Sequence, residues 1–323
     1  MKAIILAGGK GTRLGTLTDL IPKPMVEVGG IPVLGHQIAL LHRYGITDIT
    51  VLTQHLSSVI LSFVAPFNVT VIEEVTPLGT AGSIKSVAHL FTDDVMVLYG
   101  DVMVYMDLDK LMAFHESHSS DGTLVLHPND HPHDSDLVEM DLNDRITHFH
   151  SKPHNTDQYY QNLVNAGLYI LSPKLINEIE PNKKSDFGHD IFPGVTKTCR
   201  LFGYNTHEYL KDMGTPDRLK KVNFDYDSGK IEHAHRVYLQ KAVFLDRDGV
   251  INKETDLVKH PTEFELLPRV AEAIKQIHQL GYLAIVVTNQ GVVARNLCSL
   301  DTLRLIHNKM ETEIGADGAF VDA

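Results

Sequence analysis

The sequence predicts an α/β fold with a mainly parallel sheet, followed by a second and smaller α/β unit. In the first half of the chain, short apolar runs alternate with segments whose apolar residues recur at helical spacing. Near residue 239, after a polar stretch, this alternation starts afresh. The length of 323 residues agrees with about two domains, at roughly 150 residues each.

Four apolar runs in the first hundred residues predict buried strands. They are Ala3–Ala7, Ile49–Thr53, Val69–Glu73 and Val95–Tyr99. Between the first two runs, Leu34, Ile38 and Leu41 recur at helical spacing, and Ala81 and Ile84 do so between the last two. This alternation of strand and helix is typical of a parallel sheet.

From about residue 122 to 171 the pattern changes, because strand-like runs follow one another without long helices. We expect strands at Thr123–Leu126, Leu137–Asp141, Ile146–Phe149 and Ala166–Leu171. We interpret these runs as antiparallel additions to the sheet, a usual way to build a platform for a substrate.

The polar stretch Phe224–His235 interrupts the apolar periodicity, and we interpret residues 225–238 as a linker. The first domain would then span residues 1–224 and the second residues 239–323. In the second domain the pattern predicts strands at Ala242–Leu245 and Leu283–Thr288, each followed by a helix, Val270–Leu280 and Leu303–Ile314.

The composition excludes several classes of protein. With 29 Lys+Arg against 41 Asp+Glu the formal net charge is −12, which argues against binding nucleic acid or an anionic membrane by bulk charge. No run approaches the ~18 apolar residues that span a bilayer. The cysteines, Cys199 and Cys298, suggest no disulfide framework or metal site. We therefore expect a cytoplasmic protein whose partners are small molecules.

A glycine-rich loop directly after the first strand is the strongest local signal. Leu6-Ala-Gly-Gly-Lys-Gly-Thr-Arg-Leu14 places glycines where backbone N–H groups can approach an anion. Such a loop can also be only a tight strand-to-helix turn. However, Arg13 follows at once, and Lys23 lies between two prolines that restrict its direction. Two cations around a ring of N–H donors predict a triphosphate site.

These motifs resemble the sugar-1-phosphate nucleotidyltransferases, also called NDP-sugar pyrophosphorylases. Four later segments match the family in order, and the resemblance covers residues 1–224. They are Glu73–Gly82, Tyr99-Gly-Asp101, Asn165-Ala-Gly167 and the D-x-G-T-P segment Asp212–Pro216. The resemblance implies a Rossmann-like mixed sheet of the glycosyltransferase-A type, and for the whole chain a partial second α/β domain.

In this family the phosphate of a sugar 1-phosphate attacks the α-phosphorus of an NTP, and pyrophosphate leaves. By resemblance Arg13 stabilises the leaving pyrophosphate, Lys23 neutralises the α-phosphate, and Asp101 and Asp212 hold Mg²⁺. Taken alone, the two aspartates could be a strand cap and a turn residue. The implied nucleotide-binding residues are Leu6, Ala7, Gly8, Gly9, Gly11, Thr12, Gly79 and Gly82.

The sugar phosphate is the second implied ligand. The resemblance assigns it Lys152, Asn165, Gly167 and, as a weaker candidate for a sugar hydroxyl, Asp190. Ser151 stands where the family has a glutamate in an E-K-P element. The alternative for Lys152 is a solvated surface lysine.

The second unit opens on a strand that ends in Asp246-Arg-Asp-Gly249. With Val286–Gln290 it resembles the haloacid-dehalogenase phosphatases, in the branch of the heptose-bisphosphate and histidinol-phosphate phosphatases. By resemblance Asp246 is the nucleophile, Asp248 the general acid/base, both bind Mg²⁺, and Thr288 and Asn289 bind phosphate. The later motifs of that branch do not occur before Ala323, so we expect only its N-terminal part and little phosphatase activity.

The pairing of the two resemblances suggests consecutive steps on one chain. A phosphatase of this branch gives heptose 1-phosphate, so we expect GTP and heptose 1-phosphate as substrates, for GDP-D-glycero-D-manno-heptose in surface polysaccharide synthesis. The alternatives are a mannose or glucose 1-phosphate nucleotidyltransferase and a non-catalytic nucleotide-sugar binding protein. The family often forms dimers or tetramers, and the sequence leaves open whether this chain is a homo-oligomer.

Overall fold

A computed structural model of the chain describes residues 1–9, 11–15 and 21–323, without the side chain of Thr12. The chain divides into two compact units. Unit 1 comprises Met1–Val125, Met140–Ile146 and Ala166–Tyr238. Unit 2 comprises Leu126–Glu139, Thr147–Asn165 and Leu239–Ala323. We call residues 126–139 and 147–165 the insert, because the chain passes from unit 1 into unit 2 and back at each of these segments.

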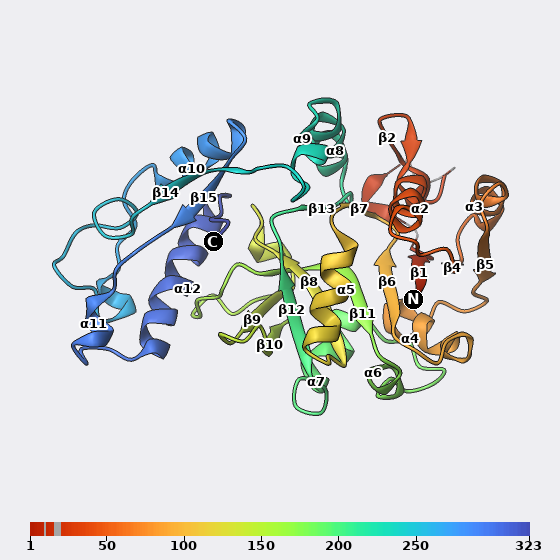
Figure 1. Ribbon diagram of the computed structural model, residues 1–323, viewed down its shortest axis with the longest axis horizontal. Helices are drawn as coiled ribbons and strands as arrows, with labels where there is room; N and C mark the ends of the chain where they lie inside the picture. The colour runs from red at the N-terminus through yellow and green to blue at the C-terminus, as the bar shows by residue number, and fades with distance from the viewer. Residues whose placement is uncertain (10, 16–20) are drawn as a thin grey trace. The chain divides into compact units, whose positions relative to one another are not determined.

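The centre of unit 1 is a parallel sheet in the order β6-β1-β4-β5, which is extended by antiparallel β11 beside β6 (Figure 1). Strand β8 pairs with both β11 and β12. The bounds are β1 Lys2–Ala7, β4 Ile49–Thr53, β5 Val69–Glu73, β6 Val95–Tyr99, β8 Gly122–His127, β11 Val164–Leu171 and β12 Leu201–Asn205. The predicted α/β class, with a mixed sheet, is confirmed for this part of the chain.

The helices of unit 1 connect these strands. They are α2 Val33–Arg43, α3 Ser57–Val64, α4 Gly79–Ser86, α5 Leu108–Ser117, α6 Pro173–Asn177, α7 Phe192–Val195, α8 Pro216–Asp227 and α9 Lys230–His233. Sequence signals set their starts: Asp107 accepts from the Lys110 N–H before α5, and Thr215 accepts from the Arg218 N–H before α8. Pro216 occupies the first helical position of α8, where its missing N–H is not needed.

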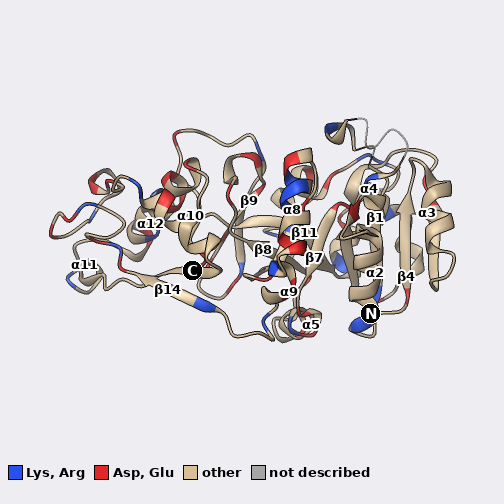
Figure 2. Cartoon of the chain, turned by 90° about the horizontal axis from the view of Figure 1, so that it is seen from above, with Lys and Arg blue, Asp and Glu red and all other residues tan. Residues whose placement is uncertain are grey.

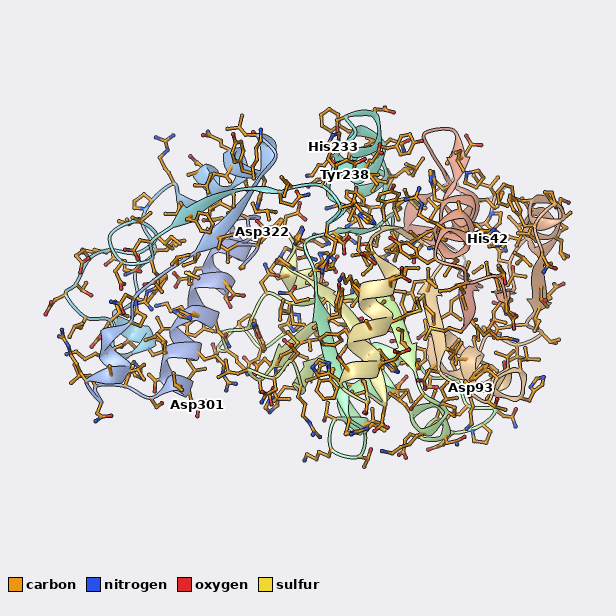
Figure 3. The ribbon with its side chains drawn as sticks, in the orientation of Figure 1. His42, Asp93, His233, Tyr238, Asp301 and Asp322 are labelled. Atoms are coloured by element: carbon orange, nitrogen blue, oxygen red, sulfur yellow. The ribbon has the colours of Figure 1, made fainter. Side chains whose placement is uncertain are left out.

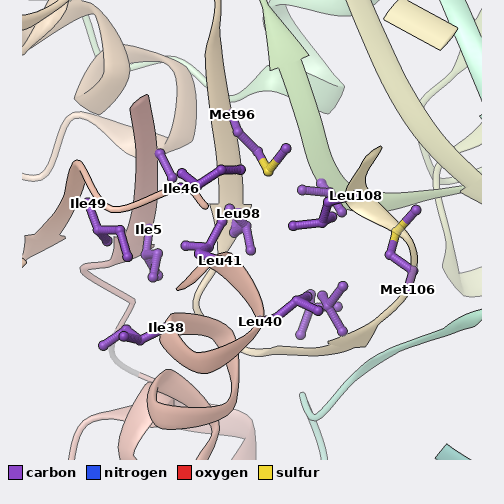
Figure 4. Close-up of a cluster of buried hydrophobic side chains, with 14 of the residues drawn as sticks. Ile5, Ile38, Leu40, Leu41, Ile46, Ile49, Met96, Leu98, Met106 and Leu108 are labelled. Carbon is purple, nitrogen blue, oxygen red and sulfur yellow. The ribbon is translucent and has the colours of Figure 1, made fainter. Parts of the chain in front are cut away.

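The core of unit 1 lies between α2 and the sheet. Ile38 and Leu41 of α2 pack toward Ile5, Ile49 and Leu98, which come from three neighbouring strands (Figure 4). Each of these side chains is fully buried or nearly so. A central parallel strand is covered on both faces, which explains why its sequence is apolar throughout rather than alternating.

Residues 225–238, which the sequence predicts as a linker, are largely helical in unit 1. They include the end of α8 and all of α9, and Ile231 of α9 is buried in a cluster with Val222 of α8. Asp225 accepts a hydrogen bond from the Tyr209 hydroxyl (3.0 Å). Helix α8 carries both acidic and basic side chains (Figure 2), and these polar residues obscure its sparse apolar spacing in the sequence.

A small second sheet in unit 1 pairs β7 (Val102–Tyr105) with antiparallel β13 (Tyr209–Asp212). Its register places Asp212 opposite Val102, and the Met213 N–H donates to the Asp101 carbonyl (2.9 Å). Two aspartates far apart in the sequence therefore meet. The short strands β2 (Glu27–Val28) and β3 (Ile31–Pro32) form a hairpin before α2.

Unit 2 has a parallel pair of strands, β14 (Lys241–Leu245) and β15 (Tyr282–Val286). Its helices are α10 Val270–Gln279, α11 Gly291–Ala294 and α12 Leu300–Ala316. Ile274 of α10 and Ile306, Met310 and Ile314 of α12 form its core. The strands and the two longer helices fall where the apolar spacing predicts them. Of the four strands expected between residues 122 and 171, β9 (Leu137–Met140) and β10 (Ile146–His150) lie mostly in the insert, and β8 and β11 lie mostly in unit 1.

The insert groups with the C-terminal residues, whereas the sequence prediction assigns it to the first domain. Pattern alone could not reveal this, because the contacts join residues about 150 positions apart. Among the described residues, no helix has both the length and the apolarity that crossing a bilayer requires.

Candidate functional site

Unit 1 contains a cavity of about 820 Å³ at the carboxyl ends of its parallel strands. Residues at or just after the ends of four strands line it, among them Ala7, Gln54, Glu74 and Tyr99. Ligands of open α/β sheets bind at this edge, because loops there can diverge around them. The sequence therefore forms a pocket where the fold class predicts one.

The glycine-rich loop forms one wall of the cavity. Leu6, Ala7, Gly8, Gly9 and Gly11 all line it. A Cβ on Gly8 would lie 3.2 Å from Glu74 Oε2, and Gly11 has a φ of +65°, so neither position suits a larger residue. The predicted nucleotide-binding side chain of Thr12 lies outside the described part of the structure.

Lys23 and Asp101 form an ion pair in the cavity wall. Lys23 lies in a short 3-10 turn after Pro22, is only 8% exposed, and donates from Nζ to Asp101 Oδ2. Gly100 allows this approach, since a Cβ there would lie 2.9 Å from Pro24 Cγ. A buried ammonium group held by one carboxylate is a fixed positive charge for an anionic ligand.

Asp212 and Arg13 lie around Gly214, which lines the same cavity. Asp212 accepts from Arg218 Nη1 at both carboxylate oxygens (2.8 and 2.9 Å) and from the Gly214 N–H (2.9 Å). A Cβ on Gly214 would lie 2.8 Å from Asp212 Oδ1 and 3.1 Å from Arg13 Nη2. Only glycine leaves room there for the guanidinium group of Arg13, which lines the cavity too.

Asp101 and Asp212 fit a magnesium ion by the chemistry of their donors. The backbone bond between Met213 and Asp101 brings the two carboxylate-bearing residues together. Protein Mg²⁺ sites commonly use one or two carboxylates and take their remaining ligands from phosphates and water. The described residues contain no group of three or more His, Cys, Asp or Glu side chains placed to hold a metal.

Glu74 is a cavity residue whose role the sequence did not define. Burial raises its pKa, and a hydrogen bond from Ser83 lowers it in part. Its Oε1 is buried without a hydrogen-bond partner. Glu74 also lines the cavity, so a buried carboxyl group stands at the edge of the site.

The sequence matches the nucleotidyl transferase family over residues 2–229. The chain belongs to this family. A mannose-1-phosphate guanylyltransferase of Mycobacterium tuberculosis is 34% identical over 240 residues, and a mannose-1-phosphate guanyltransferase of Saccharomyces cerevisiae is 34% identical over 227 residues. These alignments cover 70% and 67% of this chain and 65% and 62% of the relatives, so the chain matches less than two thirds of their length.

Among solved structures, HddC from Yersinia pseudotuberculosis in complex with GMP-PN is similar to this nucleotidyl transferase chain. The TM-score is 0.60 and the sequence identity 29%, over 70% of this chain and 99% of that one. The structural match therefore covers a share of this chain similar to that of the family match.

Further residues of the nucleotidyl transferase pocket were not assigned individually. Six of them lie in motifs that the sequence matches to the family: Pro24, Pro77, Leu78, Thr80, Tyr99 and Gly214. Gln54, Ser83 and Lys184 lie outside the predicted motifs. Lys184 had no local signal. Chain packing brings it in, because Gly79 and Gly82 accept the backbone of residues 183–185 so closely that a Cβ on either would lie 2.5–2.6 Å from a carbonyl oxygen.

Two predicted ligand residues have other places in unit 1. Gly79 lines the cavity, but Gly82 does not; it is a packing glycine against the Lys183 carbonyl. Asp190 accepts from the Asp186 N–H (2.7 Å), within the π-helical turn that spans Phe187–Ile191. This bond, and then one from His189, lower the pKa of Asp190. Its side chain therefore closes a local turn and does not line the cavity.

The predicted sugar-phosphate residues Lys152 and Asn165 belong to the insert in unit 2. Lys152 Nζ donates to the Asp134 carbonyl (2.9 Å), and Asn165 Oδ1 is buried without a hydrogen-bond partner. Gly167, two positions further along β11, lies in unit 1 with a φ of +75°, where a Cβ would lie 3.0 Å from the ring of Tyr99. The absence of a side chain at Gly167 thus lets β11 lie close to the ring of Tyr99, a residue of the pocket.

In unit 2, side chains of the Asp-x-Asp segment after β14 form hydrogen bonds with one another and with nearby residues. Arg247 is fully buried and donates to both oxygens of Asp248 (2.9 and 3.0 Å) and to Gln290 Oε1 (2.8 Å). Asn252 and Gln290 also donate to Asp248. Burial raises the pKa of Asp248, but the hydrogen bonds from Gln290, Asn252 and Arg247 outweigh it, so the pKa is lowered.

The remaining predicted phosphatase residues surround this cluster. Asp246 accepts from the Arg247 N–H (2.7 Å), and Thr288 Oγ1 accepts from Gln290 (2.8 Å). Asn289 directly follows Thr288 in the loop after β15. The Gln290 side chain therefore engages two of the four predicted residues, Asp248 and Thr288, and the Arg247 side chain engages Asp248. The roles of Asp246, Asp248, Thr288 and Asn289 stay predictions.

Proposed function

We propose that unit 1 transfers a guanylyl group from GTP to a sugar 1-phosphate, which gives a GDP-sugar and pyrophosphate. The observation that carries the proposal is the buried Lys23–Asp101 pair in a glycine-lined cavity with Arg13. Family membership supports the reaction class.

The reaction needs positioning and charge neutralisation, not a protein nucleophile. An oxygen of the sugar phosphate forms a bond to the α-phosphorus of GTP, and the bond from that phosphorus to the bridging oxygen breaks. The electron pair leaves with pyrophosphate. Lys23 lowers the repulsion between the two anions, and Arg13 stabilises the charge that develops on the leaving group.

Asp101 and Asp212 are the residues that would hold Mg²⁺. When bound, the ion neutralises phosphate oxygens that the protein's own cations leave exposed. Asp101 also fixes the Lys23 ammonium group through their ion pair, and Arg218 fixes the carboxylate of Asp212. These contacts let each group keep its direction before substrates arrive.

Guanine is the base that the cavity supports best. Guanine offers N1–H and N2–H₂ donors on one edge, and a carboxylate can accept from both. Glu74, whose carboxyl group lines the cavity, is the acceptor we assign to this edge. The GMP-PN bound to HddC and the guanylyltransferase names of the relatives support the same base.

For the sugar we place mannose 1-phosphate first, because the curated relatives are mannose-1-phosphate guanylyltransferases. Heptose 1-phosphate is the second candidate. It rests on the resemblance of residues 239–323 to the front part of a heptose-bisphosphate phosphatase. For that part we propose little or no phosphatase activity in this chain, because Arg247, Asn252 and Gln290 already bind Asp248.

The test is a panel assay of the whole chain with Mg²⁺. Each NTP is combined with mannose, glucose and D-glycero-D-manno-heptose 1-phosphate, and pyrophosphate is measured. We expect release with GTP and with mannose or heptose 1-phosphate. No release with any pair would support the non-catalytic binding alternative, and a preference for UTP or dTTP would refute the assignment of Glu74.

A further inference from the structure

In unit 1, residues 183–186 lie against the first turn of α4 and are held there by backbone hydrogen bonds. The Ser185 N–H donates to the Leu78 carbonyl (2.8 Å), and the Ser185 carbonyl accepts from the N–H groups of Ala81 (3.0 Å) and Gly82 (3.3 Å). The first N–H groups of a helix have no acceptor within the helix itself. The Ser185 carbonyl supplies that acceptor, so the segment is fixed to α4 at three points.

Side chains fasten the same segment to the wall of the cavity. The Thr80 hydroxyl donates to Asp186 Oδ2 (2.7 Å) and accepts from the Phe187 N–H (2.9 Å). A Cβ on Gly79 would lie 2.5 Å from the Ser185 carbonyl oxygen, so the two backbones are in close contact. Gly79 and Thr80 both line the cavity. The backbone on the C-terminal side of Lys184 is therefore anchored to residues of the cavity wall.

Lys184 is the residue of this segment that lines the cavity. Its side chain is exposed, and its ammonium group has no hydrogen bond or ion pair with another residue in the parts of the chain that the structure describes. The neighbouring Lys183 differs, because its ammonium group pairs with Glu180 (3.1 Å) outside the cavity. Lys184 thus combines a fixed backbone with a cation that no protein carboxylate neutralises.

The cavity has three cationic side chains among the described residues, namely Arg13, Lys23 and Lys184. Lys23 is paired with Asp101, and Arg13 Nη2 and Asp212 Oδ1 approach the same point beside Gly214. Two of the three cations therefore lie beside the carboxylates that would hold Mg²⁺. Lys184 belongs to a different part of the wall, at the start of α4.

The proposed reaction brings two anions into this cavity, the triphosphate of GTP and the phosphate of the sugar. Arg13 and Lys23 are assigned to the triphosphate, together with the Mg²⁺ ion. A phosphate monoester carries between one and two negative charges at neutral pH, and a lysine ammonium group binds it by a charge-assisted hydrogen bond. Among the described cations of the cavity, Lys184 remains for the second anion.

We propose that Lys184 binds the phosphate of the incoming sugar 1-phosphate. The contact holds the attacking oxygen in the cavity and offsets part of the charge that two phosphates bring together. This inference rests on the proposed function. It names a contact for the sugar phosphate within unit 1 itself, on a segment that the glycines of α4 hold in place.

The experiment compares K184M with K184R in the full chain with Mg²⁺. Methionine keeps a long unbranched side chain without the charge, and arginine keeps the charge. K183A is the matched control, since it removes the adjacent exposed lysine. D93N changes the net charge at a remote point, because Asp93 is exposed before β6, at the end of that strand opposite to the cavity (Figure 3). KM values for GTP and for the preferred sugar 1-phosphate are measured separately.

We expect K184M to raise the KM for the sugar 1-phosphate about thirtyfold, as the loss of a hydrogen bond to a charged group implies, with the KM for GTP unchanged. K184R should lose much less, and K183A and D93N should resemble the unmodified chain. An unchanged KM for the sugar 1-phosphate in K184M, or an equal rise in the KM for GTP, would overturn the inference while leaving the proposed function intact. An unmodified chain that releases no pyrophosphate with any pair would refute the proposed function itself.

Direct binding gives a second readout that does not depend on turnover. Titration calorimetry measures mannose 1-phosphate binding in the presence of Mg²⁺ and a GTP analogue whose α–β bridging oxygen is replaced by NH. Added salt should weaken binding to the unmodified chain more than to K184M, because ions screen the contact between the ammonium group and the phosphate. The same affinity and the same salt dependence in both proteins would contradict the assignment of Lys184.

Discussion

The pocket of unit 1 and the Asp-x-Asp cluster of unit 2 both combine carboxylates with a buried cation. The two regions differ in how these charged groups are hydrogen-bonded. In the pocket, Lys23 has one carboxylate partner and Glu74 keeps an oxygen without a hydrogen bond. In the cluster, Arg247 donates to both oxygens of Asp248, and Asn252 and Gln290 donate to one oxygen each. Arg247 Nη1 and Asn252 Oδ1 have no hydrogen-bond partner among the described residues. Because Arg218 holds Asp212 of the pocket in a similar way, the two regions differ mainly in the Lys23 ammonium group, which lines an open cavity.

The same residue types therefore mark a binding site in one unit and a structural network in the other. A buried arginine between two aspartates has been desolvated, and only good geometry offsets that cost. We infer that the cluster now contributes to the stability of unit 2, and the pocket to chemistry. Three substitutions and one pH titration test this difference between the two regions.

The largest expected effect is on the pocket. Lys23→Ala should lower kcat for pyrophosphate release by about 10²–10³-fold, because a preorganised charge at the reacting phosphates is lost. Steady-state kinetics with GTP and the preferred sugar 1-phosphate measure it. Lys220→Ala is the matched control, since Lys220 is exposed on α8. Equal rates for K23A and the unmodified chain would contradict the role of Lys23.

In the cluster the expected effect is on stability. Asp248→Ala leaves Arg247 buried with a weaker set of partners, and should lower the free energy of unfolding of unit 2 by about 3 kcal/mol. Denaturation curves measure this loss, and Asp246→Ala serves as the comparison, because Asp246 accepts only a backbone N–H from Arg247. If D248A were as stable as the unmodified chain, the cluster would not be a structural network.

In unit 2, the carboxyl group of Glu311 accepts a hydrogen bond from the Asn162 N–H and has a shifted pKa, so the stability of the unit should depend on pH. Burial raises its pKa to about 7, although the Asn162 N–H opposes the shift. A carboxyl whose folded pKa lies above its unfolded value binds more protons when folded, so stability falls as the pH rises from about 5 to 8. We expect a loss on the order of 2 kcal/mol over that range, and a flatter profile for E311Q. Identical profiles in chemical denaturation would contradict this expectation.

The smallest effect concerns the base. Glu74→Gln replaces one acceptor of the proposed guanine contact by an amide donor, so kcat/KM for GTP should fall about tenfold, in the range of one lost base contact. The preference for GTP over ATP should narrow by a similar factor. Gln54→Ala, another residue at a strand end in the cavity, tests whether any change there has this effect. An unaltered GTP/ATP ratio in E74Q would remove Glu74 from base recognition.

Much of the pocket could be predicted because its residues lie directly after recognisable strands or in glycine-rich segments. The apolar run Ala3–Ala7 determines where the loop with Gly8, Gly9 and Arg13 must begin, and all three residues line the cavity. Lys184 could not be predicted, because the packing of its neighbours Lys183 and Ser185 on Gly82 and Gly79 brings it there. Gly82 is the converse case: its motif suggests a ligand, but a backbone carbonyl fills the space beside it.

The C-terminal half was harder to interpret for a different reason. The motif at Asp246–Gly249 indicates a chemistry, but it does not reveal that the Arg247 side chain turns inward and binds Asp248. The helical spacing of Ile306, Met310 and Ile314 predicts α12 correctly. No local pattern indicates that Glu311 and Thr312, on the same helix, accept hydrogen bonds from the backbone of the insert.

One preparation of the whole chain can test whether unit 1 catalyses nucleotidyl transfer while the Asp-x-Asp cluster has a structural role. Pyrophosphate release is measured with GTP, Mg²⁺ and mannose or heptose 1-phosphate, and phosphate release is measured in parallel with heptose 1,7-bisphosphate. We predict pyrophosphate release that K23A abolishes, and no phosphate release above background. Robust phosphate release that D246A abolishes, with no pyrophosphate formed, would show instead that unit 2 is the catalytic part.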